Sequence, residues 1–129
     1  MAAIASNLRI VFVMAGNEDE AAKIARALVE ERLAACVNIL GPVRSVYRWR
    51  GAIEDEREYL LVIKSQARLY SRVERKVREL HSYEVPEIIA VAIAQGSKPY
   101  LEWLVESTAA QRTSRVSARR RGRSTLVTG

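Results

Sequence analysis

The order in which two kinds of apolar pattern alternate is the strongest constraint on how this chain folds. Residues 8–14 form a short, β-branched apolar run, which is typical of a buried strand. Residues 21–33 then place apolar side chains three or four positions apart, as on one face of a helix. The same succession returns later, with helical spacing over residues 69–80 and an apolar run over residues 88–93. Two strand-like segments lie between these halves, so the predicted order is β-α-β-β-α-β.

That order predicts a ferredoxin-like fold of the α+β class, in which the chain follows the split βαβ plan. Both long helices are expected to cover one face of a four-stranded antiparallel sheet, giving a two-layer sandwich. Pro99 suits the first turn of an extra C-terminal helix over residues 100–106. We therefore predict one folded domain, residues 1–106.

The two central strands are expected to form a long β-hairpin. Residues 34–39 begin the first strand, and Gly41-Pro42 interrupts it at an edge position or a bulge. Residues 43–49 then alternate between the two sides of a strand. Beyond a turn at Arg50-Gly51, residues 52–65 return as the second strand. Typical strands have only about five or six residues, so this hairpin is long for so small a domain.

The positive charge of the chain is confined to its C-terminal segment. The formal net charge is +6, but residues 1–106 carry 15 basic and 15 acidic residues. Residues 107–129 hold six arginines and no acidic or aromatic residue, so we predict a disordered Arg-rich tail. Arginines contact phosphates non-specifically, whereas single-stranded nucleic acid also needs aromatic stacking. The tail is therefore either a solvated extension or a non-specific nucleic-acid contact, and no other nucleic-acid binding is expected.

Several classes of protein are not expected. There is no apolar run of 18 residues for a membrane span, and residues 1–6 lack the pattern of a secretory signal. Cys36 is the only cysteine, so no intrachain disulfide can form and a cytoplasmic location is expected. No phosphate-binding glycine loop, nucleophile elbow or zinc helix occurs, so we do not expect an enzyme.

Residues 81–87, His-Ser-Tyr-Glu-Val-Pro-Glu, concentrate polar chemistry immediately before the last predicted strand. They include the only histidine, His81, together with Tyr83, Glu84 and Glu87. Polar side chains of this density, set just before a strand, could form a site. The alternative is a hydrogen-bonded turn between a helix and a strand. Use of Glu84 or Glu87 as a catalytic base is a further alternative, as is a dyad of Cys36 with His81, although an inert thiol is favoured there.

Four segments resemble the CutA family of divalent-cation-tolerance proteins: residues 31–39, 47–54, 81–89 and 100–104. The resemblance runs from about Ile10 to Val105. It implies a homotrimer of ferredoxin-like subunits similar to PII signalling proteins, tolerance to divalent metals and to copper above all, and no enzymatic reaction.

The resemblance also implies a metal site, which in some members consists of a cysteine and two adjacent histidines. Those positions correspond here to Val13, Leu80 and His81, so only His81 carries over. Copper(II) prefers imidazole, and thiolate suits copper(I). With metal binding implied by the resemblance, the candidate ligands of Cu(II) or another divalent cation are His81, Glu84, Glu87 and Cys36.

Two functions follow as expectations from the residues and the resemblance. The first is a non-enzymatic, homotrimeric protein of copper or divalent-metal tolerance with a weak metal site near His81. The second is a PII-like signalling or scaffold trimer that binds a small ligand in a cleft between subunits. The residues expected at the trimer contact or cleft are Tyr47, Trp49, Tyr83, Pro86 and Trp103, although Tyr47 and Trp49 could instead pack within one subunit.

Overall fold

The structure is a computed structural model that describes residues 7–110. Its sheet is antiparallel throughout and has the order β2-β3-β1-β4, which confirms the predicted ferredoxin-like fold of the α+β class. The elements in chain order are β1 (Leu8–Ala15), α2 (Glu18–Glu30), β2 (Cys36–Trp49), β3 (Ala52–Gln66), the 3₁₀ turn η1 (Ala67–Leu69), α3 (Tyr70–Leu80), β4 (Ile88–Ala92) and α4 (Lys98–Ser107).

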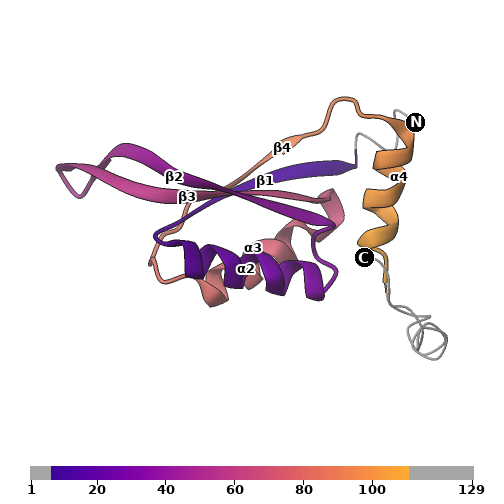
Figure 1. Cartoon of the computed structure of the whole chain (residues 1–129), viewed down its shortest axis with the longest axis horizontal. Helices are drawn as coiled ribbons and strands as arrows, with labels where there is room; N and C mark the ends of the chain where they lie inside the picture. The colour runs from indigo at the N-terminus through magenta and orange to yellow at the C-terminus, as the bar shows by residue number, and fades with distance from the viewer. Residues whose placement is uncertain (1–6, 111–129) are drawn as a thin grey trace.

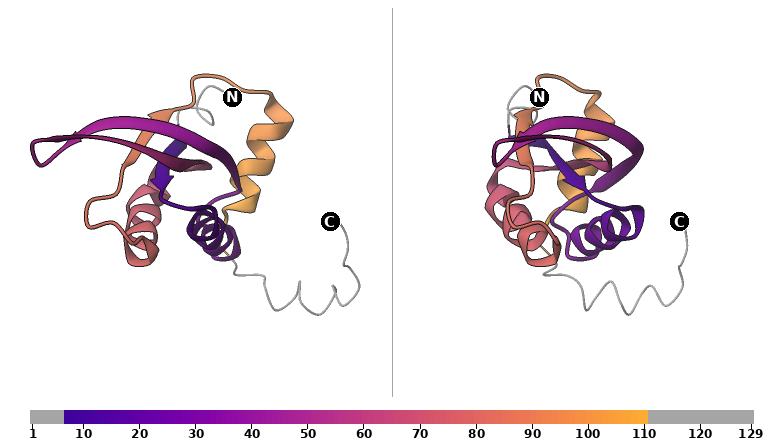
Figure 2. Two further views of the ribbon diagram at one scale, coloured as in Figure 1. Left: turned by 60° about the vertical axis from the view of Figure 1, so that its left-hand side comes forward. Right: turned by 90° about the vertical axis from the view of Figure 1, so that its left-hand side faces the viewer.

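The main core lies between one face of the sheet and the helices α2 and α3, which run side by side beneath it (Figures 1 and 2). Alternate residues of β1 and β3 point into this core because side chains alternate along a strand. The fully buried members include Val13 and Leu61 from the sheet, Ile24 from α2 and Val77 from α3. The other side of the sheet is not covered by α2 or α3, and we call it the open face.

The helix α4 stands at the end of the sheet where β1 begins (Figure 1). It buries Leu101 and Leu104 against Leu8 in a second, smaller core. Packing continues past the predicted domain boundary at residue 106, because Thr108 is buried and its hydroxyl accepts a 2.7 Å hydrogen bond from Gln66. The predicted disorder of the tail concerns mainly residues 111–129, which lie outside the described residues.

The hairpin of β2 and β3 projects far beyond the helices (Figure 1). Gly41-Pro42 forms a bulge between Leu40 and Val43 on the edge strand β2, with a cis peptide bond, which confirms the predicted edge position or bulge. A side chain at Gly41 would meet the ring of Tyr59 at 2.4 Å, so only glycine fits beneath that ring. At the tip, Arg50 and Gly51 both have positive φ, 51° and 84°, as a two-residue type I′ turn requires.

Candidate functional site

A cavity of about 670 Å³ lies between the projecting hairpin and the loop that joins α3 to β4. We call it the hairpin cleft. The loop contributes Tyr83, Glu84, Val85 and Glu87, and Met14 at the end of β1 closes one side. The hairpin supplies the remaining lining residues, which are Ser45, Val46, Tyr47, Trp49, Arg50, Glu56 and Glu58. Aromatic and acidic side chains therefore predominate around the cleft.

Two tyrosines of the cleft each donate a hydrogen bond to a glutamate of β3. The hydroxyl of Tyr83 lies 2.9 Å from Oε2 of Glu58, and the hydroxyl of Tyr47 lies 2.8 Å from Oε1 of Glu56. Burial, followed by the hydrogen bond to Glu58, raises the pKa of Tyr83 well above its ordinary value. The hydrogen bond to Glu56 raises the pKa of Tyr47 to about 12. Both phenols therefore stay protonated at neutral pH and hold their protons toward the carboxylates.

Arg50 at the hairpin tip connects the hairpin to the loop. Its guanidinium lies 3.1 Å from a carboxylate oxygen of Glu84 and 5.0 Å from the centre of the Trp49 ring. Both side chains of this ion pair are exposed to solvent, so the pair contributes little to stability by itself. Its importance is geometric, because it joins the tip of the hairpin to the loop across the mouth of the cleft.

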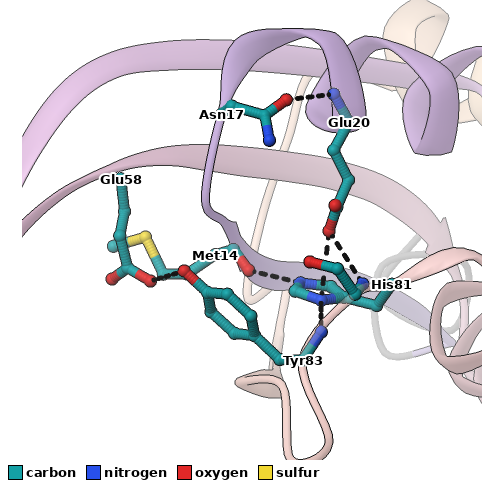
Figure 3. A network of polar contacts seen from close by, with 7 residues as sticks. Met14, Asn17, Glu20, Glu58, His81 and Tyr83 are labelled. Atoms are coloured by element: carbon teal, nitrogen blue, oxygen red, sulfur yellow. Dashed lines mark hydrogen bonds and ion pairs between the residues drawn. The ribbon is translucent and has the colours of Figure 1, made fainter.

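His81 is buried, and both of its ring nitrogens have partners within the chain (Figure 3). Nε2 lies 2.7 Å from the carbonyl oxygen of Met14, which can only accept a hydrogen bond. Nδ1 accepts a 3.1 Å hydrogen bond from the backbone N–H of Tyr83. Nε2 therefore donates its proton to the Met14 carbonyl, and both ring nitrogens are satisfied within the chain. His81 thus ties the loop to the end of β1.

Glu20 adds a second connection to this loop. Asn17, the N-cap of α2, accepts a 2.8 Å hydrogen bond from the backbone N–H of Glu20. The carboxylate of Glu20 accepts from the backbone N–H of Ser82 at 3.1 Å and lies 3.2 Å from Nδ1 of His81 (Figure 3). The start of α2 therefore holds the loop.

The structure separates Cys36 from the other metal-ligand candidates. Cys36 pairs with Lys64, whereas Met14, the contact of His81, pairs with Leu60 four positions along β3. At the rise of a strand this is a separation of about 13 Å. Glu84 and Glu87 line the hairpin cleft, and the buried ring of His81 lies beneath it. Among residues 7–110 of one chain, no three His, Cys, Asp or Glu side chains form a group that could hold a metal. The described part of one chain therefore does not supply three such ligands to a metal ion.

Of the five residues expected at a trimer contact or cleft, Tyr47, Trp49 and Tyr83 line the hairpin cleft. Pro86 is half-buried in the same loop but does not line the cavity. Trp103 lies on α4, where the centre of its ring lies 5.4 Å from that of Tyr100 with the two planes tilted by 41°, and it borders a different hollow.

Sequence reasoning missed the glutamates of β3. Glu54, Glu56 and Glu58 alternate along one strand, so they share a face, and two of them line the cleft. That spacing of two was the available signal. The role of Arg50 follows only from the turn geometry at the tip.

The fold and the cleft together define a small protein of the α+β class. Its β2–β3 hairpin projects beside the loop that joins α3 to the edge strand β4. The family model described as "CutA1 divalent ion tolerance protein" matches residues 9–107. The chain belongs to this CutA1 family.

Curated relatives carry the same family name. The divalent-cation tolerance protein CutA of Thermus thermophilus is 46% identical over 99 residues, which are 77% of this chain and 96% of that protein. Protein CutA of Mus musculus is 44% identical over 105 residues, which are 81% of this chain but only 59% of the mouse protein. The match therefore spans a little over half of the mouse relative.

Solved structures agree with the fold. The CutA structure from Xylella fastidiosa has a TM-score of 0.78 at 38% identity and covers 81% of this chain and 100% of its own. CutA1 from Oryza sativa has a TM-score of 0.79 at 38% identity, with 82% of this chain and 97% of that chain covered. Within residues 7–110 no helix combines the length and apolar character that crossing a membrane requires.

Proposed function

We propose that this chain acts as a homotrimer in divalent-cation tolerance without catalysing a reaction, and that its hairpin cleft lies at the contact between subunits. The observation that carries the proposal is the apolar character of the open face. Membership of the CutA1 divalent ion tolerance family also supports the proposal.

The open face carries apolar side chains on three adjacent strands. The register places Ile89 opposite Phe12 and Val91 opposite Ile10, and Phe12 also pairs with Val62. Ile89 is 53% exposed and Val91 is 46% exposed in the single chain. Monomeric proteins rarely leave an apolar surface of this kind in water, so burial against other copies supports assembly.

The edges and the hairpin also support assembly. Both edge strands, β2 and β4, lack a partner on one side within the described residues, and unpaired edges tend to pair with another chain. On the projecting hairpin, Val46 and Ile53 are 63% and 60% exposed. A contact between unlike surfaces closes into a ring when its rotation permits, which suits a trimer.

Substitution of Val91 by Glu tests the trimer directly. It places a charge on the open face at an exposed position, so the subunit should fold but the mass should fall from trimer to monomer in light scattering after gel filtration. Lys98→Glu, on exposed α4, is the matched control and should leave the trimer intact. A wild-type monomer, or a Val91→Glu trimer of unchanged stability, contradicts the proposal.

We further propose that copper or another divalent cation binds weakly and takes its ligands from more than one subunit. Glu84 and Glu87 are the accessible candidates, because both line the cleft. His81 would join them only by giving up its contact with Met14 or with Tyr83. Cys36 is the remaining candidate, about 13 Å from Met14 along the strands.

Titration calorimetry with Cu(II) separates these ligands. A weak, saturable isotherm is expected in wild type, and a Glu84→Gln, Glu87→Gln double variant should lose it while His81→Ala loses it only if the imidazole binds. Equal affinity in all three proteins, or no isotherm, rejects the site. Circular dichroism on each variant checks that it remains folded.

A small-ligand role for a trimer of PII-like type is the second candidate, and the hairpin cleft favours it. Its volume of about 670 Å³ lies within the usual range of ligand sites, roughly 300–1,000 Å³. The raised pKa values of Tyr47 and Tyr83 favour binding over proton transfer there. A thermal-shift screen of charged and neutral metabolites tests this role, and a screen without any stabiliser counts against it.

The location proposed for the protein is the cytoplasm. Relatives include a chloroplastic CutA of Arabidopsis thaliana and a periplasmic CutA of Archaeoglobus fulgidus, so the compartment varies within the family. Fractionation of cells that express the full chain tests the proposal.

A further inference from the structure

We propose that the hairpin cleft binds an organic cation, namely an alkyl group that ends in a guanidinium or a protonated amine. This inference rests on the second candidate function, a small ligand in the cleft, and names the chemical class of that ligand.

The cleft contains carboxylates that the chain does not neutralise. Of its four glutamates, only Glu84 forms an ion pair, and its partner is Arg50. Glu56, Glu58 and Glu87 have no ion-pair partner within residues 7–110. Glu58 is only 6% exposed and receives a single neutral donor, the hydroxyl of Tyr83. Buried carboxylates in proteins are normally paired with an opposite charge, so this position favours a cation from outside the chain.

The aromatic walls suit a cation that also carries an apolar part. The rings of Trp49, Tyr47 and Tyr83 all border the cavity. Aromatic faces attract guanidinium and ammonium groups through the negative charge at the centre of the ring. A bare metal ion gains nothing from such walls, and no group of three ligand side chains forms within the described part of one chain.

Arg50 shows that this surface accepts a guanidinium. Its own guanidinium lies 5.0 Å from the centre of the Trp49 ring and 3.1 Å from the carboxylate of Glu84. The same two features, a ring and a carboxylate, recur within the cleft as Tyr83 with the buried Glu58 and as Tyr47 with the exposed Glu56. The side chain of Arg50 is thus an internal model of the proposed ligand at the mouth of the cleft.

The hydrogen-bond pattern excludes an anionic ligand from the same positions. The hydroxyl groups of Tyr47 and Tyr83 each donate their single hydrogen bond to a glutamate. This part of the cleft therefore presents oxygen acceptors, and a ligand with several N–H donors satisfies them. The same carboxylates would repel an anionic ligand.

The experiment uses four butyl compounds of different charge on the full chain: n-butylguanidinium, n-butylammonium, n-butanol and butyrate. Titration calorimetry should show saturable binding of the two cations at millimolar concentration, with n-butanol and butyrate showing none. Glu58→Gln should weaken cation binding by about tenfold or more, since it keeps the shape and removes the charge. Asp55→Asn, on the other face of the hairpin and paired with Arg44, should bind as wild type does.

A measurement on wild type keeps the test valid if Glu58→Gln does not fold. The chain has two tryptophans, so its NMR spectrum shows two indole N–H signals, which Trp103→Phe assigns. Butylguanidinium should shift the signal of Trp49 and leave that of Trp103 in place.

Three results overturn the inference: no saturable binding of either cation, equal binding of butyrate, or undiminished binding by folded Glu58→Gln. Light scattering on the same samples separates this failure from that of the proposed trimer. If the protein is a trimer that does not bind the cations, only the proposed ligand class is refuted. If the protein is a monomer, the proposed assembly is refuted.

Discussion

The hydroxyl of Tyr83 donates a 2.9 Å hydrogen bond to Oε2 of Glu58, and this bond joins the loop after α3 to the projecting hairpin. The two residues come from segments that are otherwise linked at the tip only by the exposed pair of Arg50 with Glu84. Because Glu58 is buried, its carboxylate depends on this donor. The shape of the hairpin cleft therefore depends on one phenol.

Replacing Tyr83 by Phe should lower the free energy of unfolding by about 1.5–3 kcal/mol, the range for a lost hydrogen bond to a charged group. Urea unfolding followed by circular dichroism measures the change. Tyr47→Phe is a matched control, since it removes a bond of 2.8 Å to the exposed Glu56 and should cost less. Equal losses in both variants would show that burial of Glu58 does not matter.

Alkaline pH should destabilise the protein through the same two tyrosines. Their pKa values are raised in the folded state, that of Tyr47 to about 12, whereas an unfolded tyrosine titrates near pH 10. A raised folded pKa gives stability that is complete below about pH 10 and is lost as the pH rises toward 12. The urea midpoint should therefore fall across this window. The fall should be smaller in a Tyr47→Phe, Tyr83→Phe double variant, and an identical profile would rule out this cause.

Gly16 should tolerate no side chain while Tyr83 is in place. A Cβ atom at position 16 would lie 2.9 Å from the Tyr83 hydroxyl oxygen, which the bond to Glu58 holds. Gly16→Ala should therefore lower stability by about 1–2 kcal/mol by displacing the phenol. In a double-mutant cycle, Tyr83→Phe should recover part of this loss, because the obstructing atom is gone. Strictly additive losses would contradict the contact.

His81→Ala should cost about 2–4 kcal/mol, because it opens a cavity and leaves the Met14 carbonyl and the Tyr83 N–H without partners. Glu20→Gln should cost less, since an amide oxygen still accepts from the N–H of Ser82. Chemical denaturation compares the two variants. Long-range proton–nitrogen NMR should find a proton on Nε2 of His81, and an Nε2 without a proton would contradict its hydrogen bond to Met14 in Figure 3.

Trp49→Ala should lower the thermal midpoint and shift the mass toward monomer, if the hairpin cleft lies between subunits as proposed. Differential scanning calorimetry and light scattering measure the two effects. Arg26→Ala, an exposed change on α2, is the control. A stable trimer with alanine at position 49 would place the subunit contact elsewhere.

The fold was accessible from the sequence because its apolar patterns are local. The spacing of residues 69–80 and the runs at residues 8–14 and 88–93 depend on near neighbours alone, and the elements were found within a few residues. The same holds for Gly41-Pro42, because a proline cannot donate to the ladder, which predicted the bulge that lies on the edge strand β2.

The site was only partly accessible, because it is made by contacts between distant segments. Tyr83 meets Glu58 and Glu20 meets His81 only after the chain has folded. Each of these residues has a local role in the sequence, as a turn, a strand or a cap. Nothing local distinguishes the imidazole of a metal ligand from one that holds a loop, and the difference lies in the partners of its two nitrogens.

The pairing of β1 with β4 has a consequence for how the protein folds. Arg9 pairs with Ala92, so the sheet is complete only when segments near both ends of the folded region meet. The β2–β3 hairpin closes through near neighbours and can form early, whereas the edge strand joins over a large sequence separation. High contact order of this kind slows folding. We therefore expect the open face, which is proposed to hold the subunits together, to form last. Assembly of the trimer should then follow the folding of each chain.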